Sequence, residues 1–123
     1  MADEVTQAEK TKLEGFEEFR RYKRNQIDVR LKLTSRSHGV VTTAFGRGTD
    51  ISEAGLAAYV SMELNLGRRV DMELTLPYSQ QPIKLMAIVR NRRGHCYGLE
   101  FLKLPAPERE QILRSCRALS LVQ

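Results

Sequence analysis

The chain has 123 residues, which is enough for one domain with a modest hydrophobic core. Its 41% hydrophobic and 28% charged residues are typical of a soluble globular protein, and its two cysteines are too few for a disulfide framework. No apolar run is long enough for a membrane span, and the polar N-terminal residues do not resemble a signal peptide. We therefore expect a cytoplasmic protein without a membrane partner.

The net charge of +5 is unevenly distributed over the first third of the chain. Residues 1–19 contain six acidic residues and two lysines, whereas residues 20–36 contain seven basic residues and one acidic residue. This switch fits a second segment that binds an anion, and it equally fits a solvated surface. Residues 1–18 are predicted to be a flexible or loosely helical leader, followed by one domain over residues 19–123.

From Gln26 onwards, apolar residues recur at every second position, which is typical of half-buried strands. The pair Gly46 and Gly48 predicts a bulge or a tight bend inside one of these strands. Strands at this spacing, joined by turns such as SRSHG, predict a small antiparallel barrel or sandwich. The expected strands lie at 26–34, 40–52, 55–60, 69–76, 82–92 and 95–104.

Residues 105–122 change to a helical pattern. Pro107 lies near the expected start, acidic residues follow in the first turn and arginines come later, as the helix dipole favours. One face is apolar, so we expect the helix to pack on the barrel and Cys116 to be a core residue rather than a nucleophile. That face comprises Ile112, Leu113, Cys116 and Leu119.

The segment RRYKR, residues 20–24, offers a candidate anion site just before the first strand. Arg20 and Arg24 are four residues apart and can converge on one anion, because a guanidinium donates two parallel hydrogen bonds to phosphate and stacks on bases. Arg21 and Lys23 lie between them and add either phosphate contacts or long-range attraction. Alone, this spacing is weak evidence, since any arginine-rich chain produces it by chance.

The segment DISEAG, residues 50–55, joins the second and third expected strands. Asp50 could accept hydrogen bonds from a guanine edge, Ser52 could reach a phosphate or a base, and Gly55 could let backbone approach a ligand. In the alternative interpretation, Asp50 and Ser52 only satisfy backbone N–H groups of the turn. The segment by itself favours this structural interpretation.

Together, R-x-x-x-R before the first strand and D-x-S-x-x-G between the second and third resemble the signature of the PilZ family. The five matching residues are Arg20, Arg24, Asp50, Ser52 and Gly55. The resemblance implies a six-stranded antiparallel β-barrel with one C-terminal helix. It also implies a bacterial, cytoplasmic receptor for cyclic di-GMP that changes conformation and regulates an unidentified downstream effector protein.

By this resemblance, Arg20 and Arg24 would hold phosphates and stack on guanine, while Asp50 and Ser52 would contact a guanine edge and a phosphate. Gly55 would permit close approach of the backbone. A late strand often supplies a side chain that stacks on guanine in this family. Arg90 could do so here, or it could be an ordinary solvated charge.

No catalytic motif, metal-ligand spacing or cofactor signature is present in the sequence, so we do not expect an enzyme. Two other functions remain open. One is a barrel that binds single-stranded nucleic acid, although the chain has no tryptophan and we do not expect its aromatic residues to cluster on adjacent strands as a stacking platform requires. The other is a PilZ domain that binds only proteins.

Overall fold

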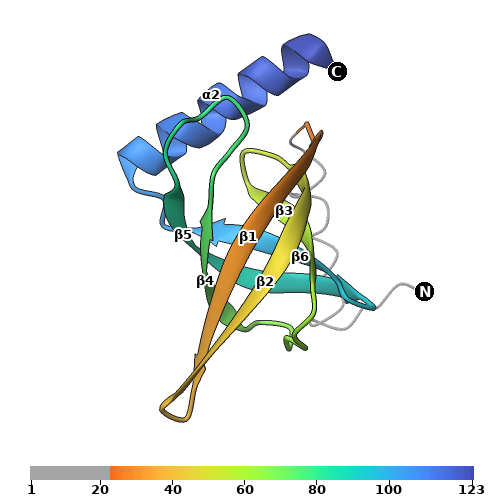
Figure 1. The fold of residues 1–123 in the computed structure, drawn as a ribbon, viewed down its shortest axis with the longest axis vertical. Helices are drawn as coiled ribbons and strands as arrows, with labels where there is room; N and C mark the ends of the chain where they lie inside the picture. The colour runs from red at the N-terminus through yellow and green to blue at the C-terminus, as the bar shows by residue number, and fades with distance from the viewer. Residues whose placement is uncertain (1–22) are drawn as a thin grey trace, which may run out of the picture.

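The computed structural model describes residues 23–123, which form a closed antiparallel barrel of six strands with a helix lying across one end (Figure 1). The order of strands around the barrel is β1-β2-β3-β6-β5-β4. This architecture confirms the predicted barrel and C-terminal helix. The elements are β1 (Asn25–Ser37), β2 (Val40–Ile51), β3 (Gly55–Val60), β4 (Arg69–Leu74), β5 (Ile83–Arg93), β6 (Cys96–Leu102) and α2 (Ala106–Val122).

The core fills the barrel because apolar residues alternate along strands such as β1, β4 and β5. Side chains such as Leu33, Val89 and Leu99 have no exposed surface. The predicted inward face of the fourth strand is confirmed. Its members Val70, Met72, Leu74 and Leu76 are all at most 3% exposed.

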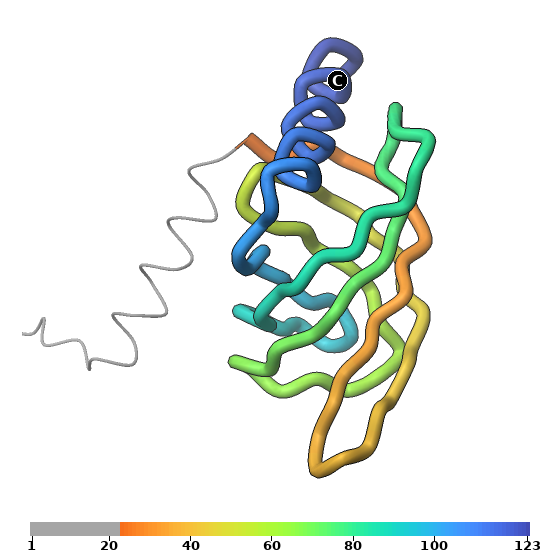
Figure 2. The backbone as a smooth tube through the Cα atoms, turned by 90° about the vertical axis from the view of Figure 1, so that its left-hand side faces the viewer, coloured from red at the N-terminus to blue at the C-terminus, as the bar shows by residue number. Residues whose placement is uncertain are grey.

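The hairpin formed by β1 and β2 is longer than the sequence predicted. The predicted five-residue turn is only His38 and Gly39, both with positive φ, as a two-residue hairpin turn requires. The expected turn residues 35–37 continue β1 and pair with Val40–Thr42. Residues 35–45, here called the ribbon, extend beyond the rest of the barrel (Figures 1 and 2).

The predicted irregularity at the two glycines of β2 is confirmed. The register between β2 and β3 shifts between Gly48 and Asp50. A Cβ atom on Gly46 would lie 2.4 Å from the carbonyl oxygen of Tyr59. Glycine at position 46 therefore lets the two backbones approach each other closely.

Helix α2 packs on the barrel through Ile112, Cys116 and Leu119, as predicted, while Leu113 is only half-buried. Buried Ser115, which the apolar pattern could not reveal, donates a hydrogen bond to the carbonyl oxygen of Pro77 (2.7 Å). Within residues 23–123, no helix combines the length and apolar character needed to cross a membrane.

The end of α2 is fastened to the start of β1. The Gln123 side chain accepts a hydrogen bond from the backbone N–H of Gln26 (2.9 Å) and donates one to its carbonyl oxygen (2.7 Å). Ser120 donates to the side chain of Asn25 (3.2 Å). The residue next to Arg24 is thereby held by both the barrel and the helix.

Candidate functional site

The turn between β2 and β3 is built around Ser52, whose side chain is buried. Its hydroxyl accepts hydrogen bonds from the backbone N–H groups of Ala54 (3.2 Å) and Gly55 (3.3 Å). The Ser52 backbone N–H donates to the Gly55 carbonyl (2.9 Å), and the N–H of Phe101 donates to the Ala54 carbonyl (2.9 Å). Serine at this position therefore shapes the turn and ties it to β6.

The register of β1 brings Arg24 to this turn. Asn25 is opposite Ile51 and Gln26 is opposite Asp50, so the exposed Arg24 enters β1 beside the segment 50–55. Asp50 is half-buried at the end of β2, and Lys23 is exposed. The start of β1 and the end of β2 thus meet at one end of the barrel. Arg20 and Arg21 lie outside the described residues.

Beside the turn, the outer face of the barrel carries very small side chains. Leu56 and Ala58 are fully buried, so alternation places Gly55 and Ala57 on the outer face, where Gly55 is still buried and Ala57 is half-buried. Ala57 is opposite Gly98 on β6. A Cβ on Gly98 would lie 2.5 Å from the amide atoms of Asn91, so the amide lies directly across this glycine. This strip of small residues, which sequence patterns did not identify, is covered at Gly98 by the Asn91 side chain.

Arg90 lies next to the same strip. Its Nε donates to Glu100 Oε2 (2.7 Å), and Glu100 is directly opposite Gly55. Arg90 occupies the position at which the register between β5 and β6 shifts. The ion pair holds a guanidinium near the turn, where the carboxylate can orient its plane. The sequence revealed Arg90 as a candidate but gave no sign of Glu100 as its partner.

The environment of Cys116 does not suggest a nucleophile. Burial raises the pKa of the Cys116 thiol to about 11, and the nearby Glu53 carboxylate adds to this shift, so the thiol is protonated at neutral pH. His95, expected in a strand beside Cys96, instead lies in the β5–β6 turn. Within residues 23–123, no group of three or more His, Cys, Asp or Glu residues is arranged to hold a metal ion.

A second surface lies toward the opposite end of β2. Phe45 on β2 and Tyr59 on β3 are 70% and 58% exposed and line one shallow groove of about 530 Å³. The prediction that aromatic residues would not gather on adjacent strands was therefore wrong. It failed because the register of β2 and β3 decides which residues meet. The groove is completed by Arg30, Gly46, Arg47, Val60, Ser61 and His95.

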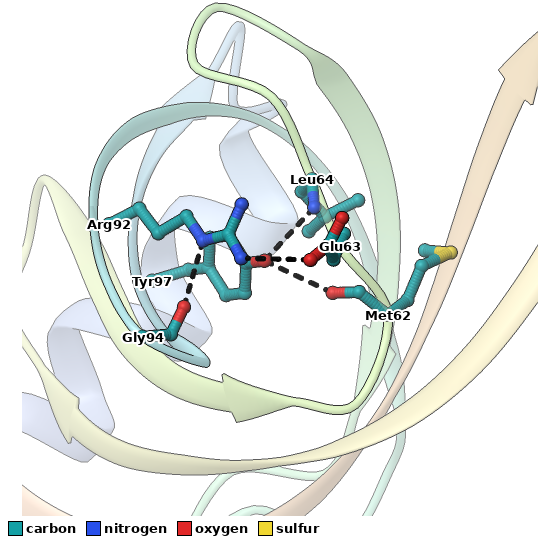
Figure 3. Close-up of polar contacts among 6 residues, drawn as sticks. All are labelled: Met62, Glu63, Leu64, Arg92, Gly94 and Tyr97. Atoms are coloured by element: carbon teal, nitrogen blue, oxygen red, sulfur yellow. Dashed lines mark hydrogen bonds and ion pairs between the residues drawn. The ribbon is translucent and has the colours of Figure 1, made fainter.

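A polar network fixes the segment that follows Ser61 (Figure 3). The hydroxyl of the fully buried Tyr97 accepts from the backbone N–H of Leu64 (3.0 Å) and donates to the Met62 carbonyl (3.1 Å). Arg92 lies over the Tyr97 ring, 5.4 Å from its centroid. It also donates to the Gly94 carbonyl (2.8 Å) and pairs with Glu63 (3.5 Å). The β3–β4 loop is thereby joined to the β5–β6 hairpin.

Comparison with known proteins identifies the family. The family model described as "PilZ domain" matches residues 18–118. A search of curated proteins finds no match.

Three solved structures share the fold at low sequence identity. The PilZ domain of CeSA from a cellulose-synthesizing bacterium has a TM-score of 0.61 and 13% identity, covering 80% of this chain and 98% of that one. The PilZ domain of YcgR from Escherichia coli, with c-di-GMP, has a TM-score of 0.64 and 18% identity, covering 83% and 92%.

The third is the inhibitor of motility MotI/DgrA from Bacillus subtilis, with a TM-score of 0.66 and 16% identity. The match covers 83% of this chain but only about half, 51%, of that one. The family model, which spans most of the chain, and the six-stranded barrel with its terminal helix agree. This chain belongs to the PilZ domain family.

Proposed function

We propose that this protein is a cyclic di-GMP receptor that acts as a non-enzymatic adaptor on a downstream bacterial protein. The observation that carries the proposal is the meeting of Arg24 with the 50–55 turn at one end of the barrel. Membership of the PilZ family supports it, as does the structural likeness to a PilZ domain with c-di-GMP.

In this proposal, each residue of the signature has a physical role. Arg20 and Arg24 bind the phosphates and stack on guanine, since guanidinium groups suit both contacts. Asp50 accepts hydrogen bonds from a guanine edge. Ser52 contributes by shaping the turn with its hydroxyl, because its side chain is buried and bonded to the backbone. Gly55 permits close approach of the backbone to the nucleotide, because it carries no side chain.

Three further residues support the ligand from the periphery. Arg90, oriented by Glu100, stacks on a guanine at the small-residue strip. Arg21 and Lys23 add attraction for a dianionic nucleotide. The ligand needs no metal or cofactor in this scheme, because all contacts come from side chains and backbone.

Isothermal titration calorimetry with cyclic di-GMP tests the proposal, using the wild type and Arg24→Ala. We expect micromolar or tighter binding that Arg24→Ala weakens by about 2 kcal/mol, as the loss of a charge-assisted phosphate contact does. Arg109→Ala, an exposed arginine on α2, is the matched control and should bind like the wild type. A folded wild type that gives no heat would overturn the proposal.

The conformational part of the proposal has a separate test. Binding is expected to change the protection of the segment that carries the arginines, because ligand contacts fix its backbone. Hydrogen exchange of residues 13–25 with and without nucleotide measures this change. Equal protection, together with positive calorimetry, would mean that the protein binds the nucleotide without the expected switch.

A further inference from the structure

The ribbon has an open backbone edge. Within residues 23–123, β2 pairs with β3 only from Gly46 to Ile51, so residues 40–45 pair with β1 alone. Every second residue on this edge directs its N–H and C=O groups away from β1. Such an edge can accept one more strand, because an extended peptide offers the complementary groups.

Exposed apolar side chains follow the same edge. Val41 and Phe45 share one face of β2 and are 58% and 70% exposed. Tyr59 on β3 is 58% exposed and forms one apolar patch with these two residues. Alternate side chains of an added strand would meet these residues, since both strands repeat with a period of two.

Arginine side chains lie beside this apolar patch. The groove formed by Phe45 and Tyr59 is also lined by Arg30 and Arg47, and none of its lining residues is acidic. Arg47 makes a short ion pair with Asp28, which holds the pKa of that exposed carboxyl below its ordinary value. Within residues 23–123, Arg30 makes no ion pair with a carboxylate, so its charge is available to a ligand.

The wall of the groove is held in place before any partner arrives. Val60 N–H donates to the His95 carbonyl (3.0 Å), and the Tyr97 network fixes Met62 and Leu64 just beyond Ser61 (Figure 3). A surface fixed in this way loses less conformational entropy on binding than a mobile one.

From these observations we propose that the ribbon and its groove bind an extended, acidic segment of a partner protein. The segment pairs with the open edge of residues 40–45 as an additional strand. It takes the place beside these residues that β3 takes beside residues 46–51. Its apolar side chains pack on Val41, Phe45 and Tyr59, and its carboxylates face Arg30 and the groove. This site is separate from the 50–55 turn, so it does not depend on nucleotide binding.

Two other occupants fit the surface less well. A second copy of the chain, paired edge to edge, would bring together two grooves that each carry Arg30 and Arg47, and such like-charge contacts are unfavourable. Single-stranded nucleic acid could stack on Phe45 and Tyr59, but it would leave the backbone edge of residues 40–45 unpaired. It would also gain no stacking from Val41.

The test measures fluorescence anisotropy with a labelled short peptide in which glutamate alternates with valine and phenylalanine. We expect the wild type to bind it, and Phe45→Ala and Arg30→Ala to weaken binding about tenfold, as removal of an anchor at an interface does. Tyr78→Ala, an exposed aromatic residue far along the chain from this groove, and Arg109→Ala are matched controls that should bind as the wild type does.

Two further probes separate the alternatives. A peptide with lysine in place of glutamate, and the acidic peptide with a central proline, should both bind at least about tenfold more weakly. In backbone NMR, the acidic peptide should shift the amide signals of residues 40–45 in a titration. Calorimetry with cyclic di-GMP on Phe45→Ala should match the wild type, which keeps this test independent of the proposed nucleotide site.

Three results would overturn the proposal. The first is equal binding of the acidic peptide by the wild type, Phe45→Ala and Arg30→Ala. The second is tighter binding of a labelled single-stranded oligonucleotide that Phe45→Ala abolishes, which would identify a nucleic-acid surface. The third is concentration-dependent self-association, seen by sedimentation, that Phe45→Ala removes.

Discussion

The two ends of strand β2 differ in how their side chains are used. At the end that leads to the 50–55 turn, Ser52 is buried and its hydroxyl is bonded to backbone N–H groups. At the other end, Val41 and Phe45 are exposed on a ribbon whose outer edge has no strand beside it within residues 23–123. One end of β2 is thus a polar turn beside Arg24, and the other is an apolar edge near Arg30 and Arg47.

This difference separates residues that stabilise the fold from exposed residues that can bind other molecules. A buried hydroxyl that accepts two local backbone hydrogen bonds, as Ser52 does, stabilises a backbone shape, and substitution there acts through that shape. An exposed phenylalanine adds little to folding, so its position is free to serve binding. Substitutions at the two kinds of position should therefore differ in their effect on stability.

Tyr97→Ala should have the largest effect on stability, a loss of about 3–5 kcal/mol, because it removes a fully buried ring. It also leaves the backbone groups of Met62 and Leu64 without their partner. Urea unfolding followed by circular dichroism measures the change. Tyr97→Phe keeps the ring and should recover most of the loss, and equal effects of both substitutions would assign the stability to the hydroxyl instead.

Ser52→Ala should lower the free energy of unfolding by about 1–3 kcal/mol, because two backbone N–H groups lose their acceptor. Nucleotide affinity should fall as well, since the turn would lose its shape beside Arg24. Urea unfolding and calorimetry measure the two quantities. Unchanged stability with lost affinity would instead indicate that the Ser52 hydroxyl contacts the ligand directly.

Raising the pH should destabilise the protein partly through Cys116. Burial raises the pKa of its thiol from 9.0 to about 11, so between these values the unfolded chain loses a proton that the folded chain keeps. The contribution of the protonated thiol to the free energy of unfolding is fully present below pH 9. About 1–2 kcal/mol of it is lost as the pH rises toward 11. Unfolding at pH 8 and pH 10.5 should show a smaller pH-dependent loss for Cys116→Ala than for the wild type.

Phe45→Ala should change the free energy of unfolding by less than about 0.5 kcal/mol, since its side chain is 70% exposed. Thermal or urea unfolding checks this. A loss comparable to that of Ser52→Ala would show that Phe45 packs in the fold. It would also remove the basis for treating the two ends of β2 as different.

The fold was predictable because alternation, turn residues and the helical pattern all pointed to the same architecture. The positions of Val70 and Met72 in the core followed from period two alone. The length of the first hairpin did not, because serine and arginine at 35–37 are compatible with both turn and strand. Only pairing with Val40–Thr42 decides between them.

The candidate site was partly predictable for the same reason. The motif residues can be read from local sequence, and the register of β1 and β2 is enough to bring Arg24 to the turn. Contacts between distant strands leave no local pattern. The pairing of Arg90 with Glu100 and the nearness of Phe45 to Tyr59 depend on register shifts and strand order, which a single sequence does not encode visibly.

The hydrogen bonds between Gln123 and Gln26 have a consequence for the kinetics of folding. They join residues 97 positions apart, so the chain must already have built the barrel before these bonds can form without a large loop-closure cost. Interactions that form after the transition state slow unfolding and leave the folding rate nearly unchanged. The hydrogen bonds between Gln123 and Gln26 should therefore slow the detachment of the first strand. They determine how long Asn25 and its neighbours remain in the barrel once folding is complete.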